Sequence, residues 1–377
     1  TNIEKHDVEK FAQDHQIMAK HSLEKQTAHH ADCFTTVSEI TAVECKYFLD
    51  KEPDIITPNG FDMRILPAED VFDEKRNEAR KRLFKVLETL YGQKINENAL
   101  IAVISGRYEW RNKGIDLFIE AFNRLDTEKL KRPVIPLILV PASHGGVRNE
   151  LLNALKNNDQ EGFKQPYLTH VLHNRDADPV VKAMEYDKLY EKENLFPLFV
   201  PCYLNGYDGI FNLDYYELFI GADLGIFPSY YEPWGYTPLE SLAYKVPAIT
   251  TTLAGFGVWI NSNELNLKQG ASVIKRTDDN DTEVAEQIIT DIETYLKFSD
   301  QQVSGAREAA KEIANAALWD NLLEKYYEAY QIAIDQSADR HKEFRPKVKA
   351  KQPQIFSNKI NNEPKWGKML IQSSLPE

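Results

Sequence analysis

The stretch ALIAVISGRYEWRNKGIDLFIEAFNRL, residues 99–125, carries the pattern that decides the fold. It opens with ALIAVIS, a continuous apolar run that is typical of a strand buried on both faces of a parallel sheet. In residues 115–125 the apolar side chains recur at helical spacing, and Glu120 and Arg124 lie on the opposite side. A strand, a loop with a glycine at each end and an amphipathic helix therefore follow one another, which predicts a βα unit.

The same alternation continues along the chain as far as about residue 335. Five more short apolar runs are flanked by Gly, Pro or Asn: PVIPLILV (133–140), FPLFVP (196–201), LGIFPS (224–229), VPAITT (246–251) and ASVIK (271–275). Amphipathic helical patterns separate them, and a long helical stretch over 307–334 closes the series. We therefore predict a doubly wound α/β domain with a Rossmann-like parallel sheet over residues 61–335.

The residues before this domain look like the end of a second α/β unit. Residues 1–31 read as one polar helix, FTTVS as a strand, ITAVECKYFL as a helix and DIITPNG as a strand with a turn. Residues 1–60 are thus predicted to be the remnant of an N-terminal domain, and 336–377, which contain the basic segment 340–352, a tail or linker. Because the chain does not begin with Met, we expect a piece of a longer protein.

Composition narrows the classes of function. The 45 basic and 58 acidic residues give a net charge of −13, which repels polyanions, so nucleic acid is not an expected partner. The three cysteines form no CxxC pair, which suits a reducing compartment, and we expect a cytoplasmic protein. The longest apolar stretch falls far short of the roughly 20 residues of a membrane span. The sequence leaves open whether the chain forms a homo-oligomer.

Parallel sheets bind ligands at the carboxyl ends of their strands, where loops lead into helices. The loop after ALIAVIS contains Arg107 and Lys113, with Gly106 and Gly114 giving backbone freedom at either end. Two cations near a helix N-terminus predict a clamp for a diphosphate. An exposed basic loop without a ligand is the alternative from these residues alone.

A second loop, YYEPWGYTPLES, follows the run LGIFPS and contains two carboxylates, Glu232 and Glu240. With Thr237 as N-cap and Pro238 in the first turn, Glu240 fits the third position of a capping box, which is its structural alternative. A capping box formed by Thr237 and Glu240 would give no role to Glu232.

The segment between the two carboxylates offers backbone groups to a ligand. Gly235 allows a ligand to approach the main chain, and the amides of Gly235, Tyr236 and Thr237 could face phosphate. Glu232 would then lie near the sugar and Glu240 near a ribose hydroxyl.

These residues resemble a family, the retaining glycogen synthases of the animal and fungal type, in a bacterial-like form that lacks most of the N-terminal domain. The resemblance rests on several motifs in the family's order: EKQTAHHADCFTTVSEITAVE, PDIITPNGFD, GRYEWRNKGIDLFIEA, DYYELFIGADLGIFPSYYEPWGYTPLES and TTLAGFG. It implies the GT-B fold of two Rossmann-like domains, with a cleft between them in which the nucleotide sugar and the glucan meet.

The resemblance also implies roles for single residues. The glutamate pair matches Glu232 and Glu240, which would bind the nucleotide sugar and serve the retaining reaction. Arg107 and Lys113 would lie on the diphosphate, and Tyr215 would stack on the base. We take Glu232, Arg107 and Lys113 as the candidate catalytic residues. The remaining candidates for nucleotide-sugar binding are Tyr215, Trp234, Gly235, Tyr236, Thr237, Glu240, Lys25 and His21.

The sequence departs from the family in two places. Lys25 stands where the family has an arginine, so a bidentate phosphate contact becomes a point charge, and His21 is the substitute for a histidine that would align with Ala19. The arginine-rich helix that senses glucose 6-phosphate is matched by a segment with only Arg307 and Lys311. We therefore expect no activation by the sugar phosphate.

We expect neither a metal nor a cofactor besides the nucleotide-sugar donor. His29, His30 and Cys33 could place two ligands on one helix end, but no second ligand pair lies nearby in the sequence, so no structural zinc is predicted.

The sequence thus predicts a glucosyltransferase that moves glucose from UDP-glucose, or less favourably ADP-glucose, to an α-1,4-glucan acceptor with retention by front-face displacement. One alternative is a catalytically silent fragment that binds nucleotide or glucan. Another is a related transferase with a different sugar or acceptor. We expect this chain alone to bind UDP weakly with almost no transfer, because most of one wall of the cleft is missing.

Overall fold

The computed structural model describes residues 7–261 and 266–343, so most of the predicted tail lies outside the described residues. The chain divides into a unit of residues 1–336 and a unit of residues 337–377. Within the described ranges, no helix has both the length and the apolar character needed to cross a bilayer.

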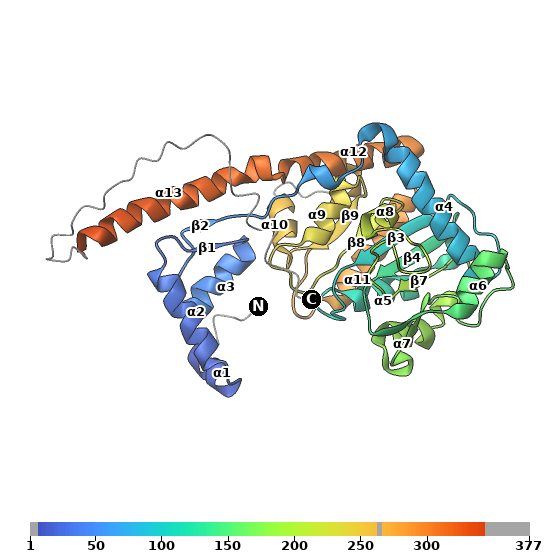
Figure 1. The fold of residues 1–377 in the computed structure, drawn as a ribbon, viewed down its shortest axis with the longest axis horizontal. Helices are drawn as coiled ribbons and strands as arrows, with labels where there is room; N and C mark the ends of the chain where they lie inside the picture. Colours follow the sequence, from blue (N-terminus) through green and yellow to red (C-terminus); the bar gives the residue numbers. More distant parts are fainter. Residues whose placement is uncertain (1–6, 262–265, 344–377) are drawn as a thin grey trace, which may run out of the picture. The chain divides into compact units, whose positions relative to one another are not determined.

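The larger unit contains a six-stranded sheet with helices around it (Figure 1). Its strands lie in the order β10-β9-β8-β3-β4-β7, and every neighbouring pair is parallel. Their bounds are β3 (Leu100–Ser105), β4 (Val134–Leu139), β7 (Leu198–Val200), β8 (Leu224–Ile226), β9 (Ala248–Thr251) and β10 (Ala271–Ile274). All six apolar runs are therefore strands, and the predicted α/β class with a parallel sheet is confirmed.

Helices cover both faces of this sheet. Along β3, Ile101 and Val103 pack into one apolar core, whereas Leu100, Ala102 and Ile104 pack into the other. The first core receives side chains from α4 (Phe72–Tyr91), α6 (Asn149–Asn157), α8 (Tyr215–Phe219), α9 (Tyr236–Ala243) and α10 (Gly255–Ile260), and the second from α5 (Ile115–Arg124), α7 (Pro179–Tyr186) and α11 (Asp281–Leu296). Successive strand residues point to opposite faces, so a continuous apolar run serves both cores. The domain is doubly wound, as predicted.

Two shorter sheets complete the strands. β5 (His144–Val147) pairs antiparallel with β6 (His170–Leu172). Near the N-terminus, β1 (Thr35–Thr36) pairs in parallel with β2 (Ile55–Ile56), and α3 (Glu39–Leu49) connects them. This small βαβ element agrees with the α/β character expected before residue 60, and the domain boundary itself stays a prediction.

The single helix predicted for residues 1–31 is wrong, because two helices occupy this segment. α1 (Val8–Asp14) and α2 (Met18–His30) are separated at Gln16, whose φ is 58°. A left-handed residue cannot continue a right-handed helix. The amide of Ile17 instead donates to the carbonyl oxygen of Ala12 at 2.8 Å, a bond that closes the end of α1.

The long helical stretch predicted at 307–334 is also interrupted. α12 (Asp300–Ala316) and α13 (Trp319–Glu343) are separated where Phe61 pairs with the chain. The amide of Phe61 donates to Ala317 at 2.9 Å, and the amide of Trp319 donates back to Phe61 at 3.2 Å. The backbone at the break is thus satisfied by a residue from the start of the domain rather than by another helical turn.

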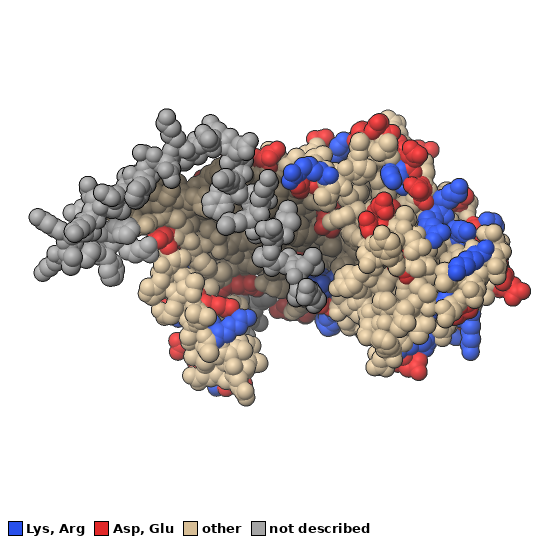
Figure 2. All heavy atoms as spheres, viewed as in Figure 1, with Lys and Arg blue, Asp and Glu red and all other residues tan. Residues whose placement is uncertain are grey.

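Acidic and basic side chains are interspersed over the face that Figure 2 shows. The expectation that nucleic acid is not a partner stays a prediction.

Candidate active site

The two loops singled out in the sequence lie side by side, because β3 and β8 are neighbours in the sheet. The amide of Tyr230, in the loop after β8, donates to the carbonyl oxygen of Asn112, in the loop after β3, at 2.9 Å. Gly114 has a φ of 69°, and a Cβ there would collide with the carbonyl of Pro228. Only glycine fits this position, so the loops are held in close contact.

Lys113 and Glu232 bring their charges together between these loops. The Lys113 ammonium donates to the Glu232 carboxylate, and the two side chains are only 11% and 17% exposed. Residues 251–257 fix the backbone of Glu232: its amide donates to Leu253 at 3.0 Å, and its carbonyl accepts from Gly255 at 3.0 Å. The Lys113 charge, expected to be free for a diphosphate, is therefore balanced by Glu232 in the ligand-free chain.

A cavity of about 350 Å³ opens at the carboxyl end of the sheet. It is lined by Gly106, Arg107, Leu139, Pro141, Cys202, Tyr203, Leu204, Tyr215, Tyr216, Thr237 and Glu240. We call it the donor cavity, after the nucleotide-sugar donor that the sequence analysis expects. Four of the predicted site residues, Arg107, Tyr215, Thr237 and Glu240, thus share one cavity although they come from three separate segments of the sequence. Lys113 lies just behind its wall, since its side chain comes within about 4.0 Å of a Cβ built at Gly106.

Arg107 is the cation among the described residues that line the donor cavity. Its side chain is 74% exposed, and its Nε contacts the carboxylate of Glu109 at 3.1 Å. An exposed ion pair of this kind is weak, so the guanidinium can reorient toward an anion at little cost.

Tyr215 forms an aromatic wall of the donor cavity. Its hydroxyl shares a hydrogen bond of 2.8 Å with the hydroxyl of Ser105, the last residue of β3. Its ring lies 4.9 Å from the ring of Tyr216 and 5.5 Å from that of Phe219, and burial raises the pKa of its phenol. The ring is therefore held in place before a ligand arrives.

The capping-box alternative for Glu240 is wrong. α9 begins at Tyr236, with Gly235 as N-cap at a φ of 113°, so Thr237 lies inside the helix. The Glu240 carboxylate instead accepts a hydrogen bond from the Tyr216 hydroxyl at 2.8 Å, and burial raises the pKa of Glu240. A partly buried carboxylate on the cavity wall with one hydroxyl partner retains acceptor capacity for a second hydroxyl group.

Five other predicted residues are not among the residues that line the donor cavity: Trp234, Gly235, Tyr236, Lys25 and His21. Trp234 is 3% exposed and packs against Trp259, where it lines a different cavity of about 510 Å³ that borders α3, α10 and α13. Tyr236 is 43% exposed at the first position of α9. Lys25 is partly buried and His21 is 9% exposed on α2, and neither belongs to the lining of the donor cavity given above.

The sequence analysis missed several residues of the donor cavity wall. Pro141 follows β4, and Cys202, Tyr203 and Leu204 follow β7. In the sheet, β4 lies beside β3, and β7 lies beside β4. The rule that ligands bind at the carboxyl ends of parallel strands could have identified them once the strand order was known.

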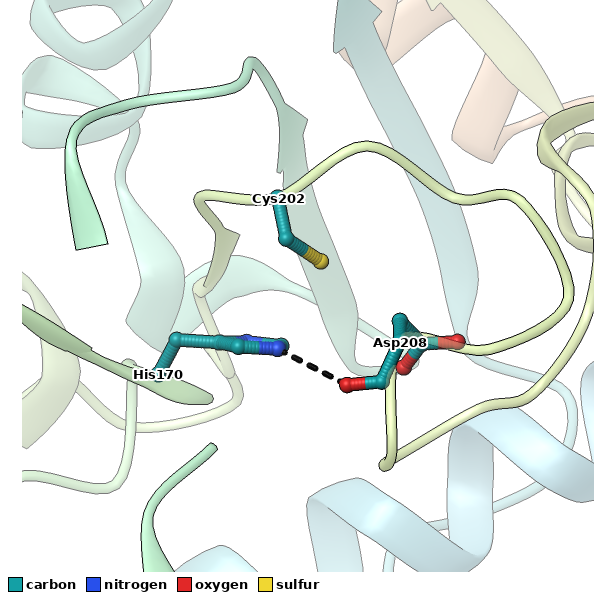
Figure 3. A group of neighbouring side chains, drawn as sticks. All are labelled: His170, Cys202 and Asp208. Carbon is teal, nitrogen blue, oxygen red and sulfur yellow. Dashed lines mark hydrogen bonds between the residues drawn. The ribbon is translucent and has the colours of Figure 1, made fainter. Parts of the chain in front are cut away.

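Behind the donor cavity, His170, Cys202 and Asp208 place ligand atoms within 4.8 Å of one another. Figure 3 shows the His170 imidazole facing the backbone oxygen of Asp208, 3.1 Å from Nε2. The other ring nitrogen, Nδ1, contacts the Thr169 hydroxyl at 2.8 Å. Both nitrogens are thus engaged.

The carboxylate of Asp208 also has partners, since it accepts hydrogen bonds from the backbone amides of Ile210, Phe211 and Asn212 at 2.6–2.9 Å. Burial raises the pKa of Cys202 to about 12, which disfavours the thiolate that a metal requires. These hydrogen bonds indicate that His170 and Asp208 stabilise the loop that carries Tyr203 and Leu204.

The segment matched to the arginine-rich helix borders another cavity, of about 390 Å³. Burial lowers the pKa of Arg307 to about 10, and Lys245 already pairs with Glu69 and Glu308. Carboxylates thus balance the lysine of this cavity, and the absence of sugar-phosphate activation stays a prediction.

Curated proteins with similar sequences are glycogen synthases. The chain is 29% identical over 415 residues to glycogen [starch] synthase isoform 2 of Saccharomyces cerevisiae, an alignment that covers 88% of the chain and 57% of that protein. It is 25% identical over 393 residues to the liver glycogen [starch] synthase of Mus musculus, with 89% and 56% covered. The chain therefore spans less than two thirds of the length of these relatives.

Among solved structures, the chain is similar to WaaG, a glycosyltransferase involved in lipopolysaccharide biosynthesis, with a TM-score of 0.45, 18% identity, and coverage of 79% of this chain and 62% of that one.

A family model described as Glycogen synthase matches residues 1–158 and 147–374, which together span almost the whole sequence. With this match and the curated relatives in agreement, the chain belongs to the glycogen synthase family.

Proposed function

We propose that this chain is the donor-binding part of a retaining glucosyltransferase, which moves glucose from a nucleotide sugar to the non-reducing end of an α-1,4-glucan. The observation that carries the proposal is the donor cavity, which unites Arg107, Tyr215, Thr237 and Glu240 at the carboxyl end of a parallel sheet. We favour UDP-glucose over ADP-glucose as donor, because the motifs resemble those of the animal and fungal enzymes.

The donor cavity offers a partner for each part of such a donor. The base stacks on Tyr215, a ribose hydroxyl donates to Glu240, and the diphosphate lies against Arg107. The amides at the start of α9, near Thr237, add the positive end of a helix. No cofactor is needed in this scheme.

The Lys113–Glu232 pair favours front-face displacement over a covalent intermediate, because a carboxylate held by a lysine is a poor nucleophile. In this step the bond between C1 of glucose and the diphosphate oxygen breaks, and the acceptor hydroxyl oxygen bonds to C1 on the same face. The hydroxyl proton passes to the departing diphosphate oxygen. Arg107 and Lys113 stabilise the negative charge that grows there.

A nucleotide-binding module without transfer activity is the second candidate. The Lys113–Glu232 pair supports it over transfer, because a lysine that already has a carboxylate partner stabilises the charge on a departing diphosphate less, whereas Arg107 and Tyr215 still line the cavity for a nucleotide.

Calorimetric titration of the chain with UDP, UDP-glucose and ADP-glucose tests the proposal. Arg107→Met should weaken UDP binding about tenfold through the lost charge-assisted contact. Arg124→Met is the control, because Arg124, at the end of α5, pairs with Glu286 instead of lining the donor cavity, and it should change the affinity less than about twofold. Equal effects of the two variants, or no nucleotide binding by the unchanged chain, would contradict the proposal.

Incorporation of labelled glucose into glycogen then separates the two candidates. Binding with incorporation identifies a transferase, and binding without it identifies a silent module.

A further inference from the structure

Arg276 lies shortly after β10, outside both loops that carry the candidate catalytic residues. Its side chain has no exposed surface (0%). A fully buried arginine is rare, because its charge loses hydration and must be compensated by partners. The partners of Arg276 therefore indicate what it does.

Two of these partners belong to the loop that carries Glu232. The Nη1 of Arg276 donates to the carbonyl oxygen of Pro228, at the start of this loop. The guanidinium also lies over the ring of Tyr230, 5.2 Å from its centroid. Arg276 thus holds the loop at two points shortly before Glu232.

The same two residues contact the loop that carries Lys113. The Pro228 carbonyl lies against Gly114, where no side chain fits, and the amide of Tyr230 donates to Asn112 at 2.9 Å. Lys113 is the residue between Asn112 and Gly114. Whatever fixes Pro228 and Tyr230 therefore fixes the backbone on both sides of Lys113.

A third contact closes the network. The Nη2 of Arg276 donates to Oδ1 of Asp281 at 3.2 Å, and Oδ2 of Asp281 accepts from Arg111 at 2.9 Å. Arg111 belongs to the loop of Lys113, so this loop is reached from Arg276 by a second route. The donors of a guanidinium form a rigid, planar fork that spans separated partners, whereas those of a lysine sit on one compact ammonium group.

We propose that Arg276 is a positioning residue, which fixes the two loops relative to each other and thereby sets where Lys113 and Glu232 meet the donor. The effect on donor binding rests on the proposed function, whereas the coupling of the loops does not.

Hydrogen–deuterium exchange of the ligand-free chain tests the coupling. In Arg276→Met, amides in both 106–114 and 228–235 should exchange about tenfold faster, because the Pro228 carbonyl and the Asp281 carboxylate lose their partner. Arg148→Met is the control: Arg148 is also buried, and it donates to the carbonyls of Gln165 and Leu168 in another part of the domain.

The control variant should leave exchange in both loops unchanged. Faster exchange in 228–235 alone, or the same exchange as in the control, would overturn the proposal. Should Arg276→Met fail to fold, Arg276→Lys decides the question, because it retains the charge and is expected to give intermediate exchange in both loops.

Comparison of UDP with uridine tests the consequence for the donor. Arg276→Met should reduce the preference for UDP over uridine about tenfold and change uridine affinity less than about twofold, since Lys113 moves and Tyr215 does not. A merely structural role would weaken both ligands equally and would contradict the positioning role. If the unchanged chain binds neither ligand, the proposed function fails, and the exchange measurement still decides whether Arg276 couples the loops.

Discussion

The Lys113–Glu232 pair makes a quantitative prediction about stability. Both side chains are largely buried, with 11% and 17% exposed, so removing one charge leaves the other poorly hydrated. Breaking a fully buried pair costs about 3–5 kcal/mol, and the remaining water contact reduces this to about 2–4 kcal/mol for Lys113→Met or Glu232→Gln alone.

The double variant should be far less destabilised than the sum of the two single variants. With both charges removed, no unpaired ion is left in the interior, and the double change should cost about 1–2 kcal/mol. The coupling free energy of the cycle, which is the sum of the two single costs less the cost of the double change, is then about 3–6 kcal/mol, larger than that of surface ion pairs.

Urea unfolding followed by tryptophan fluorescence measures this cycle. The matched control is the more exposed pair of Arg124 and Glu286, with 32% and 59% exposure, for which the coupling should stay below about 1 kcal/mol. If the Lys113 and Glu232 effects add within about 0.5 kcal/mol, the two charges do not stabilise each other and the reasoning is refuted.

Three further predictions concern the donor cavity and the Arg307 cavity. Tyr215→Ala should weaken UDP binding by about 1–2 kcal/mol in calorimetry, because the stacking on the ring is lost. Tyr215→Phe keeps the ring and loses only the hydrogen bond to Ser105, so the UDP affinity should change less than about twofold. Equal losses of affinity in the two variants would show that the base does not stack on Tyr215. Because burial raises the pKa of Glu240 in the folded chain, the folded state holds a proton there more strongly than the unfolded state, and stability is lost as the pH rises above the ordinary carboxyl range. Glu240→Gln should therefore raise the melting temperature at neutral pH, and the increase should shrink toward pH 4.5. An increase that does not change with pH would contradict this prediction. Glucose 6-phosphate should leave the melting temperature unchanged, because the lysine beside Arg307 already has carboxylate partners, and a clear rise would show that the sugar phosphate binds.

The sheet could be predicted from the sequence because its strands are buried on both faces. A strand such as β4 has no polar alternation, and its apolar run ends where the strand ends, within a residue. The sequence also indicated that Arg107, Lys113, Glu232 and Glu240 lie at the same edge of the sheet, because the loops that follow parallel strands meet there.

The breaks between helices could not be predicted, because their causes are not local. Gln16 adopts a left-handed conformation that favours Gly or Asn, so its residue type gives no signal. The break before Trp319 is set by pairing with Phe61, which is distant in sequence. The start of α9 was misplaced because Thr237 and Pro238 offer a good cap, while the chain uses the positive φ of Gly235 instead.

The ion pair between Lys113 and Glu232 could not be predicted from the sequence either. The spacing of Glu232 and Lys113 along the chain does not indicate that they pair, since their contact depends on β3 and β8 being neighbours. Nor does the sequence reveal that the Glu240 carboxylate accepts a hydrogen bond from the Tyr216 hydroxyl.

The central claim is that the donor cavity binds the nucleotide of a sugar donor. A crystal structure of the chain with UDP tests it most directly. The account predicts the base on Tyr215, the ribose beside Glu240 and the diphosphate against Arg107. UDP bound instead in the cavity of about 510 Å³ that Trp234 lines, or in the cavity of Arg307, would contradict the account.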